Sequence, residues 1–285
     1  MSFLMLSSTD LTKIASQVRR DIIRMVNGAS SGHPGGSLGA TDFLVALYFA
    51  IMKPDPNKFS IDGTDEDIFF LSNGHISPAW YSVLARYGYF QLAELETFRK
   101  LDSRLQGHPS VMDETPGVRM ASGSLGQGLS VALGAAIAKK LNGDTRTVYC
   151  LVGDGELQEG QNWEALMYGA AKGVDNIITI VDFNQKQIDG PLEEVLSLGD
   201  LRAKLESFGW LVLEMNGHDM TGILDQLIVA KQQLNQGKPV VIIMHSIMGF
   251  GVDFMHNNHE WHGVAPNDEE TERALAQLEE TMGDY

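Results

Sequence analysis

The chain has 285 residues, and the 44% that are hydrophobic can form a large packed core, which excludes global disorder. Its 21 basic and 37 acidic residues give a net charge of −16, which argues against a general binder of nucleic acid or of anionic membranes, because both need a basic face. The single cysteine, Cys150, excludes an intramolecular disulfide and a multi-cysteine metal cluster, and it fits a reducing compartment.

Two features bear on location. Residues 1–13 carry no positively charged segment before a long apolar stretch, so we expect no signal peptide and a cytoplasmic protein. The longest strongly apolar stretch, residues 43–52, is about half as long as a membrane-spanning helix. We therefore expect no association with a membrane.

The first half of the chain mixes helical patterns with irregular segments. A loop rich in glycine and serine is expected over residues 28–39, and D-I-F-F-L at 67–71 predicts a short strand. Residues 102–128 form a long irregular stretch, and such loops in compact domains are usually functional or disordered. Apolar residues at helical spacing predict helices over residues 11–25, 42–52, 78–86, 92–100 and 129–141.

The second half alternates regularly between strands and helices. Strands are expected over residues 147–152, 177–182, 210–215 and 240–245, with helices over 162–172, 201–208 and 220–234. Short, continuously apolar strands separated by helices indicate a parallel sheet that is covered on both faces. We therefore predict an α/β fold, a doubly wound and mostly parallel sheet with helices on both faces.

No repeat or linker divides the chain, so we predict a single domain over residues 1–285. Residues 246–285 are expected to extend this domain as a C-terminal loop and a surface helix. That helix is predicted over residues 267–282, with a capped start and an acidic face.

Polar residues follow two neighbouring strands. Gly153-Asp154-Gly155 follows the strand over 147–152, and Asn184 follows the strand over 177–182, thirty positions after Asp154. One strand–helix–strand crossover spans about that length, so both side chains are expected at the same edge of the sheet. A carboxylate and an amide oxygen suit Mg²⁺ or Ca²⁺, and the glycines let the backbone approach a phosphate. This predicts a site for a metal and a diphosphate. The alternative is a tight turn with an Asp N-cap and an Asn in the next turn, and the spacing between Asp154 and Asn184 favours the metal–diphosphate site over it.

Residues 153–190 resemble the thiamine-diphosphate signature in its transketolase version. Five further motifs match the transketolase family in family order: S-G-H-P-G-G at 31–36, L-S-N-G-H at 71–75, Q-G-H-P at 106–109, S-G-S-L-G-Q-G at 122–128 and W-H-G-V-A-P at 261–266. The matches run from about residue 28 to residue 266 and cover only the N-terminal, diphosphate-binding domain of that enzyme. The chain is therefore similar to the N-terminal subunit of a split transketolase, which implies the thiamine-diphosphate-binding fold.

The resemblance assigns roles to individual positions. It implies Mg²⁺, or Ca²⁺ or Mn²⁺ as substitutes, held by Asp154, Asn184 and the backbone carbonyl of Lys186. It implies that His33, His108 and His262 are catalytic residues that contact the substrate. It implies binding of thiamine diphosphate by His75, Gly123, Leu125, Gly153, Asp154, Gly155, Glu159, Asn184 and His262. Glu159 and Glu164 resemble acids at the subunit contact, although first-turn helix acids would look the same.

The resemblance also implies an activity and a partner. The expected reaction transfers a two-carbon ketol unit from a ketose phosphate to an aldose phosphate, as in the pentose phosphate pathway. The activating glutamate and most phosphate-binding groups belong to a second part of the family's enzyme. We therefore expect activity only with a separate C-terminal subunit, which would carry the pyrimidine-binding and C-terminal domains, in an α2β2 heterotetramer.

Other interpretations stay open at this point. The chain could serve another thiamine-diphosphate enzyme, such as 1-deoxyxylulose-5-phosphate synthase or a 2-oxoacid dehydrogenase component, or be a non-catalytic cofactor-binding paralogue. The four histidines placed by motifs favour ketol transfer, because polyol substrates need several hydroxyl partners. Ser124 stands where the family commonly has proline, and Lys186 where an apolar residue is common. The sequence leaves the identity of the sugars undetermined.

Overall fold

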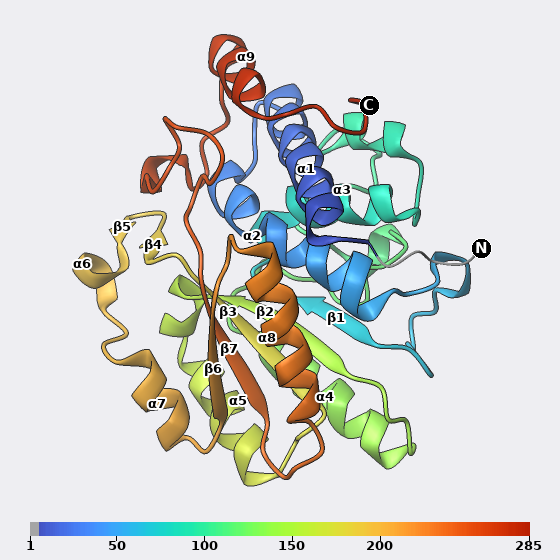
Figure 1. Cartoon of the computed structure of the whole chain (residues 1–285), viewed down its shortest axis with the longest axis vertical. Helices are drawn as coiled ribbons and strands as arrows, with labels where there is room; N and C mark the ends of the chain where they lie inside the picture. Colours follow the sequence, from blue (N-terminus) through green and yellow to red (C-terminus); the bar gives the residue numbers. More distant parts are fainter. Residues whose placement is uncertain (1–5) are drawn as a thin grey trace.

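The computed structural model describes residues 6–285 and contains a five-stranded sheet at its centre (Figure 1). Every pair of neighbouring strands in this sheet is parallel. In spatial order, the strands are β1 (Ile68–Leu71), β2 (Val148–Gly153), β3 (Ile177–Phe183), β7 (Val240–His245) and β6 (Leu211–Asn216). The predicted parallel sheet is therefore confirmed.

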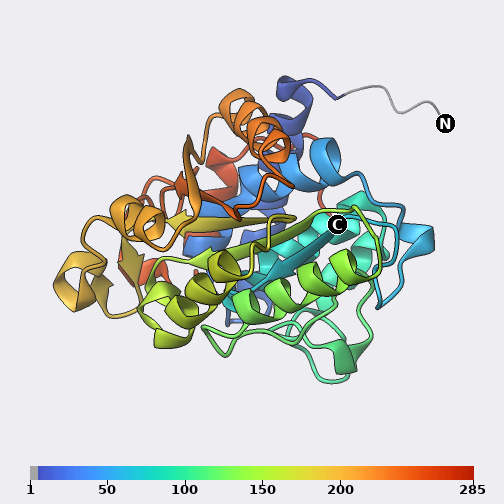
Figure 2. The same cartoon turned by 90° about the horizontal axis from the view of Figure 1, so that it is seen from below.

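Helices cover both faces of the sheet, which Figure 2 shows nearly edge-on between two helical layers. The helices are α1 (Ser8–Gly28), α2 (Pro34–Ala46), α3 (Ser77–Tyr87), α4 (Gly128–Leu141), α5 (Gly160–Ala171), α6 (Leu192–Leu196), α7 (Leu201–Ser207), α8 (Met220–Gln232) and α9 (Asp268–Gln277). A small antiparallel ladder joins β4 (Lys186–Gln187) to β5 (Gly190–Pro191) beside the carboxyl end of β3.

Side chains alternate between the two faces along each strand, and the two faces belong to separate hydrophobic clusters. In β2, Tyr149 and Leu151 pack into the cluster that includes α1, α2, α3 and α8. Val148, Cys150 and Val152 pack into the opposite cluster, with α4, α5 and α7. This arrangement confirms the doubly wound fold class and leaves the carboxyl ends of the strands free to form a site.

The prediction of a loop over residues 28–39 is wrong, because α2 already begins at Pro34. Proline suits the first position of a helix, where its missing N–H is not needed. A Cβ on Gly35 would lie 2.7 Å from Met248 Cγ, and one on Gly39 would lie 2.9 Å from the Ile247 carbonyl oxygen. These glycines therefore let a buried helix pack closely against the segment after β7, and the sequence pattern resembles a loop for that reason.

The apolar helix is consequently longer than expected. Together with the π-helical turn Leu47–Met52 it spans residues 34–52, which is long and apolar enough to cross a membrane by length and composition alone. Burial inside the protein reaches 78% of its most apolar window, and α2 packs against α1, α3 and α8. This helix therefore serves as a core helix of the fold.

Two other helices differ from expectation. Residues 92–97 form a 3-10 helix and not an α-helix, and α9 ends at Gln277. Its start is capped as predicted, since the Asn267 side chain accepts the Glu270 N–H at 2.9 Å. The chain beyond α9 returns to α1, where Ser16 Oγ donates to the Glu279 carbonyl at 2.7 Å and Arg20 pairs with Asp284. These contacts to α1 replace the last predicted helical turns.

Candidate active site

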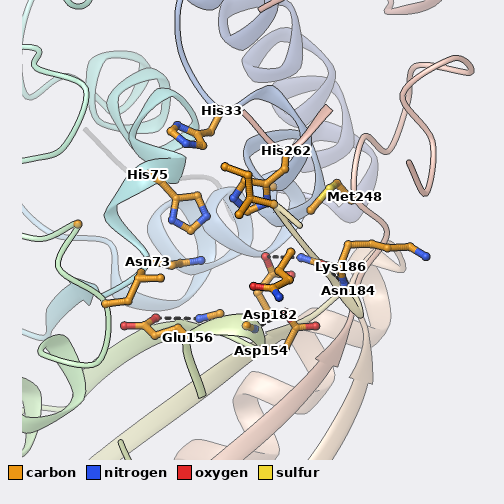
Figure 3. A pocket seen from close by; sticks show the side chains of 17 residues that line it. His33, Asn73, His75, Asp154, Glu156, Asp182, Asn184, Lys186, Met248 and His262 are labelled. Atoms are coloured by element: carbon orange, nitrogen blue, oxygen red, sulfur yellow. Dashed lines mark hydrogen bonds between the residues drawn. The ribbon is translucent and has the colours of Figure 1, made fainter. Parts of the chain in front are cut away.

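A cavity of about 250 Å³ lies beyond the carboxyl ends of β2 and β3 (Figure 3). Most of the residues assigned to the substrate, the cofactor or the metal line it: His33, His75, Gly123, Leu125, Gly153, Asp154, Gly155, Asn184, Lys186 and His262. They come from segments that are up to 229 positions apart in the chain, so only the fold brings them together.

The turns after β2 and β3 are joined to each other by Asp154. Its carboxylate accepts hydrogen bonds from the N–H groups of Gly155, at 2.7 Å, and of Gln185. Gln185 adopts a left-handed conformation with φ of +61°. The expectation that the two strand ends meet at one edge is therefore confirmed.

Two buried carboxylates lie at the floor of the cavity. Burial, as the main cause, and the nearby Asp182 carboxylate together raise the pKa of Asp154 to about 8. Burial also raises the pKa of Asp182 to about 6, although Asp182 accepts a hydrogen bond from Ser246 Oγ. Over residues 6–285, no Lys, Arg or His nitrogen lies within 4.0 Å of either carboxylate. A divalent cation is the kind of partner that two such acids lack.

Asn184 supplies a second oxygen beside Asp154. Asn184 Oδ1 accepts the Lys186 N–H at 2.9 Å, and Asn184 Nδ2 donates to Asp182 Oδ2 at 3.5 Å. Figure 3 shows the Lys186 side chain extending away from the other labelled side chains. The carboxylate, amide and carbonyl oxygens of this region form the hard-oxygen donor set that Mg²⁺ and Ca²⁺ prefer.

Three histidines face one another across the cavity. The ring centroid of His33 lies 5.2 Å from that of His75 and 5.6 Å from that of His262, and His75 lies 5.0 Å from His262. Burial lowers the pKa of all three, to about 4 for His33, so they are neutral at pH 7. The Nδ1 atoms of His33 and His262 are buried and have no hydrogen-bond partner among the described residues. Such atoms are available to a ligand.

His108 lies beside this group and not among it. Its ring centroid is 6.1 Å from that of His33, and it lines a separate, open hollow with Ser31 and Arg99. Gly123, in the loop over residues 122–128, has φ of +118°, and a Cβ there would lie 2.4 Å from the His108 ring. A glycine is therefore required at this position, both by the backbone and by the ring.

Glu156 contacts the cavity but was not among the predicted site residues. It is 2% exposed, and its carboxylate accepts the N–H groups of Gly126, at 2.9 Å, and Gly153, at 3.0 Å, and the hydroxyl of Ser72. Burial raises its pKa. Glu156 therefore ties the loop over 122–128 to the turn after β2.

The comparisons with known proteins agree on one family. Residues 11–281 match the family model described as transketolase, thiamine diphosphate binding domain. The chain is 39% identical over 276 residues to an apulose-4-phosphate transketolase subunit from Actinobacillus succinogenes, covering 96% of this chain and 98% of that protein. It is 37% identical to the 6-deoxy-6-sulfo-D-fructose transketolase subunit of Clostridium sp., covering 95% and 96%.

The chain belongs to the transketolase family. Its fold matches the solved transketolase from Leishmania mexicana with a TM-score of 0.89 at 30% identity. That alignment covers 99% of this chain and 43% of the longer protein. The predicted resemblance to the N-terminal part of transketolase is therefore confirmed.

Besides His108, two acidic residues assigned from the transketolase motifs lie outside the cavity. Glu159 occupies the N-cap position of α5 without a side-chain capping bond, is exposed, and has its Cβ beside Gly126. Glu164 is exposed on α5. Neither lines the cavity, so their position at a subunit contact stays a prediction. Ser124, where transketolases commonly have proline, is exposed in the same region.

Other lining residues were not predicted from the sequence. Asn73, Asp182 and Met248 line the cavity, and Asn73 Oδ1 is buried with no partner among residues 6–285. Asn73 lies within the L-S-N-G-H motif, which drew attention only to His75. Asp182 resembles the last residue of an apolar strand. A hydrogen bond that its carboxylate accepts comes from Ser246, which is 64 positions away.

Proposed function

We propose that the chain is the thiamine-diphosphate-binding subunit of a split transketolase. It would transfer a two-carbon ketol unit from a ketose to an aldose, acting with a separate C-terminal subunit. Support comes from the relatives of similar length, whose names describe transketolase subunits. A cytoplasmic location and an assembly of two chains of each kind are part of this proposal.

The observation that carries the proposal is the pairing of Asp154 and Asn184 below the three histidines. Asp154, Asn184 and the Lys186 carbonyl would hold Mg²⁺, because the buried acids there lack a cation. The Gly153 and Gly155 backbones would lie along the diphosphate, and Leu125 along the pyrimidine. When bound, thiamine diphosphate would supply the carbanion chemistry that ketol transfer needs.

The residues of this chain then orient the sugar and move its protons. His33 and His262 present unpartnered Nδ1 atoms at the cavity and are neutral at pH 7. A neutral imidazole can accept a proton from a sugar hydroxyl and return it when the carbon–carbon bond is remade. The apolar side chains of Met248 and Ile188 line the same cavity and limit its water.

The substrates proposed here are sugars with a terminal anion. The names of two relatives specify apulose 4-phosphate and 6-deoxy-6-sulfo-D-fructose, which end in a phosphate and a sulfonate. A role in the pentose phosphate pathway is one member of this class. The family match favours transketolase over the other thiamine-diphosphate enzymes considered above.

The test is a calorimetric titration of the chain with thiamine diphosphate and Mg²⁺, with and without the C-terminal subunit. We expect binding that depends on Mg²⁺, and ketol transfer only in the presence of the second subunit. No metal-dependent binding under either condition would overturn the proposal. Tight binding without transfer in the complete assembly would favour the non-catalytic paralogue.

A further inference from the structure

His218 is a largely buried histidine that the proposed function does not use. It lies in the turn between β6 and α8, and its side chain is only 7% exposed. Both ring nitrogens have a partner: Nδ1 lies 3.1 Å from Asp42 Oδ2, and Nε2 lies 2.8 Å from the backbone nitrogen of Ile247. The ring therefore joins α2 to the segment that follows β7.

The two partners determine which nitrogen carries the proton. A backbone N–H can only donate, so Nε2 accepts the Ile247 N–H and is unprotonated. The proton of the neutral ring then lies on Nδ1, which donates to Asp42. Burial lowers the pKa of His218, although the Asp42 carboxylate acts in the opposite direction, so the ring is neutral at pH 7.

The His218 ring is held firmly in one orientation. Asp42 receives Arg19 Nη1 at 3.1 Å and Nη2 at 2.6 Å, one on each carboxylate oxygen, and this pair is buried. Arg19 already neutralises Asp42, so the carboxylate does not need a positive charge on His218. Phe250 stacks on the imidazole with ring centroids 3.6 Å apart and an interplanar angle of 7°. Hydrogen bonding and stacking together fix both the position and the plane of the ring.

The segment that His218 holds carries two parts of the active-site cavity. Met248 lines the cavity, and Figure 3 shows its side chain there. The Ser246 hydroxyl donates to the carboxylate of Asp182 at the cavity floor. Ile247 lies between these two residues along the chain. A shift of the backbone at Ile247 would therefore change the wall and the floor of the cavity together.

Two backbone hydrogen bonds hold the chain on either side of Met248. The Ile247 N–H donates to His218, and the Gly249 N–H donates to the Gly35 carbonyl at 2.9 Å. Without the first bond, a partly buried N–H would lose its partner, and the segment would gain free energy by moving towards another acceptor. The position of Met248 therefore depends on the imidazole as well as on α2.

We propose that His218 is a positioning residue for the active site. Its neutral ring, anchored on Asp42, holds the backbone at Ile247 and thereby keeps Met248 in its place in the cavity wall. His218 does not line the cavity, so it acts only through this segment. The inference rests on the proposed function, because it concerns the cavity in which thiamine diphosphate would bind.

The first test uses the unmodified chain at pH 7, without cofactor. Long-range ¹H–¹⁵N NMR spectra of the imidazole ring distinguish the two neutral tautomers from each other and from the charged ring. We expect a proton on Nδ1 of His218 and none on Nε2. A proton on Nε2 would overturn the proposal, because the ring could not then accept the Ile247 N–H. This measurement needs no variant.

The second test removes the acceptor and then restores it. His218→Phe keeps a flat ring against Phe250 but cannot accept the Ile247 N–H, whereas the amide oxygen of His218→Gln can. In His218→Phe, we expect hydrogen exchange at the Ile247 amide to become about tenfold faster. We also expect the methyl NMR signal of Met248 to shift, and the affinity for thiamine diphosphate with Mg²⁺ to fall about threefold to tenfold. His218→Gln should restore most of each property.

His245→Phe is the matched control, because it removes an exposed imidazole from the end of β7, two positions before Ile247. It should leave the exchange rate and the affinity unchanged. Melting temperatures report whether each variant folds. If His218→Phe does not fold, His218→Asn replaces it, since its amide is too short to reach Ile247.

Two results of the second test would overturn the proposal. One is an unchanged Met248 signal and cofactor affinity in a folded His218→Phe, which would leave His218 with a purely structural role. The other is equal behaviour of the variants that lack and keep the acceptor. Absence of cofactor binding in the unmodified chain would instead overturn the proposed function. The tautomer, the exchange rate and the Met248 signal are all measured without cofactor, so the two failures are distinguishable.

Discussion

The carboxylate of Glu156 accepts a hydrogen bond from the backbone N–H of Gly126 at 2.9 Å. The same carboxylate accepts the Gly153 N–H at 3.0 Å and the Ser72 hydroxyl, which in turn accepts the Gly128 N–H at 3.1 Å. One buried acid therefore connects the end of β1, the turn after β2 and the loop over residues 122–128. The relative positions of the proposed diphosphate and pyrimidine contacts depend on it.

We expect Glu156→Gln to weaken cofactor binding about tenfold or more, since the new NH₂ group would face backbone donors and leave at least one buried N–H unsatisfied. The free energy of unfolding should fall by about 1–3 kcal/mol. Titration of thiamine diphosphate with Mg²⁺ and urea unfolding measure the two effects. Glu272→Gln, on the exposed face of α9, is the control, and an equal affinity for both variants would contradict the role of Glu156.

Asp154→Ala should abolish metal-dependent cofactor binding while the chain stays folded. The residue lies in the turn after β2, and its removal also relieves the cost of a buried carboxyl group without a cation. Circular dichroism reports the fold, and calorimetry with Mg²⁺ reports binding. Asp225→Ala on α8 removes an exposed acid and should leave both unchanged. Unaltered cofactor affinity in Asp154→Ala would count against the metal assignment.

Gly123→Ala should destabilise the loop over residues 122–128. The left-handed backbone disfavours a Cβ, and that atom would collide with the His108 ring. We expect a loss of about 1–3 kcal/mol in the free energy of unfolding and weaker cofactor binding. Gly134→Ala in α4 is a matched control, because a Cβ there meets no atom within 4 Å. That control should be neutral or stabilise by about 1 kcal/mol, and equal effects of both substitutions would argue against the steric account.

The neutral histidines predict a dependence of stability on pH. The pKa of His33 is lowered from 6.5 to about 4, so protons bind to the unfolded chain more readily than to the folded one. This contribution is absent above pH 6.5, and it destabilises the fold as the pH falls from 6.5 towards 4.

His33→Asn removes this one proton site. Between pH 7 and pH 5, urea unfolding should show that the variant loses about 1–2 kcal/mol less stability than the unmodified protein. The comparison between the two proteins cancels the titration of other groups, such as the buried acids. Parallel pH profiles would show that His33 does not titrate in this way.

The strands and helices that depend on local residue patterns were mostly predictable from the sequence. The features that depend on contacts between distant residues mostly were not. The strands and the meeting of Asp154 with Asn184 follow from periodicity and crossover length. The start of α2 was missed because Gly35 and Gly39 look like loop residues until the packing of Met248 and Ile247 against them is known.

The remaining site residues carry no local signal. Glu156 connects parts of the site by accepting hydrogen bonds from Ser72 and Gly126, which are 84 and 30 positions away. Such features arise from the three-dimensional pairing of side chains, which a single sequence does not encode as a recognisable motif.

The placement of β1 has a consequence for folding. β1 is an edge strand and pairs only with β2, yet residues 72–147 separate the two strands along the chain. Closing so long a connection costs chain entropy before the pairing returns any stability. Asn73 and His75, which line the cavity, follow closely after β1, so their part of it forms only once this distant pairing is made. The order in which the strands assemble therefore decides when a newly made chain can first hold its cofactor.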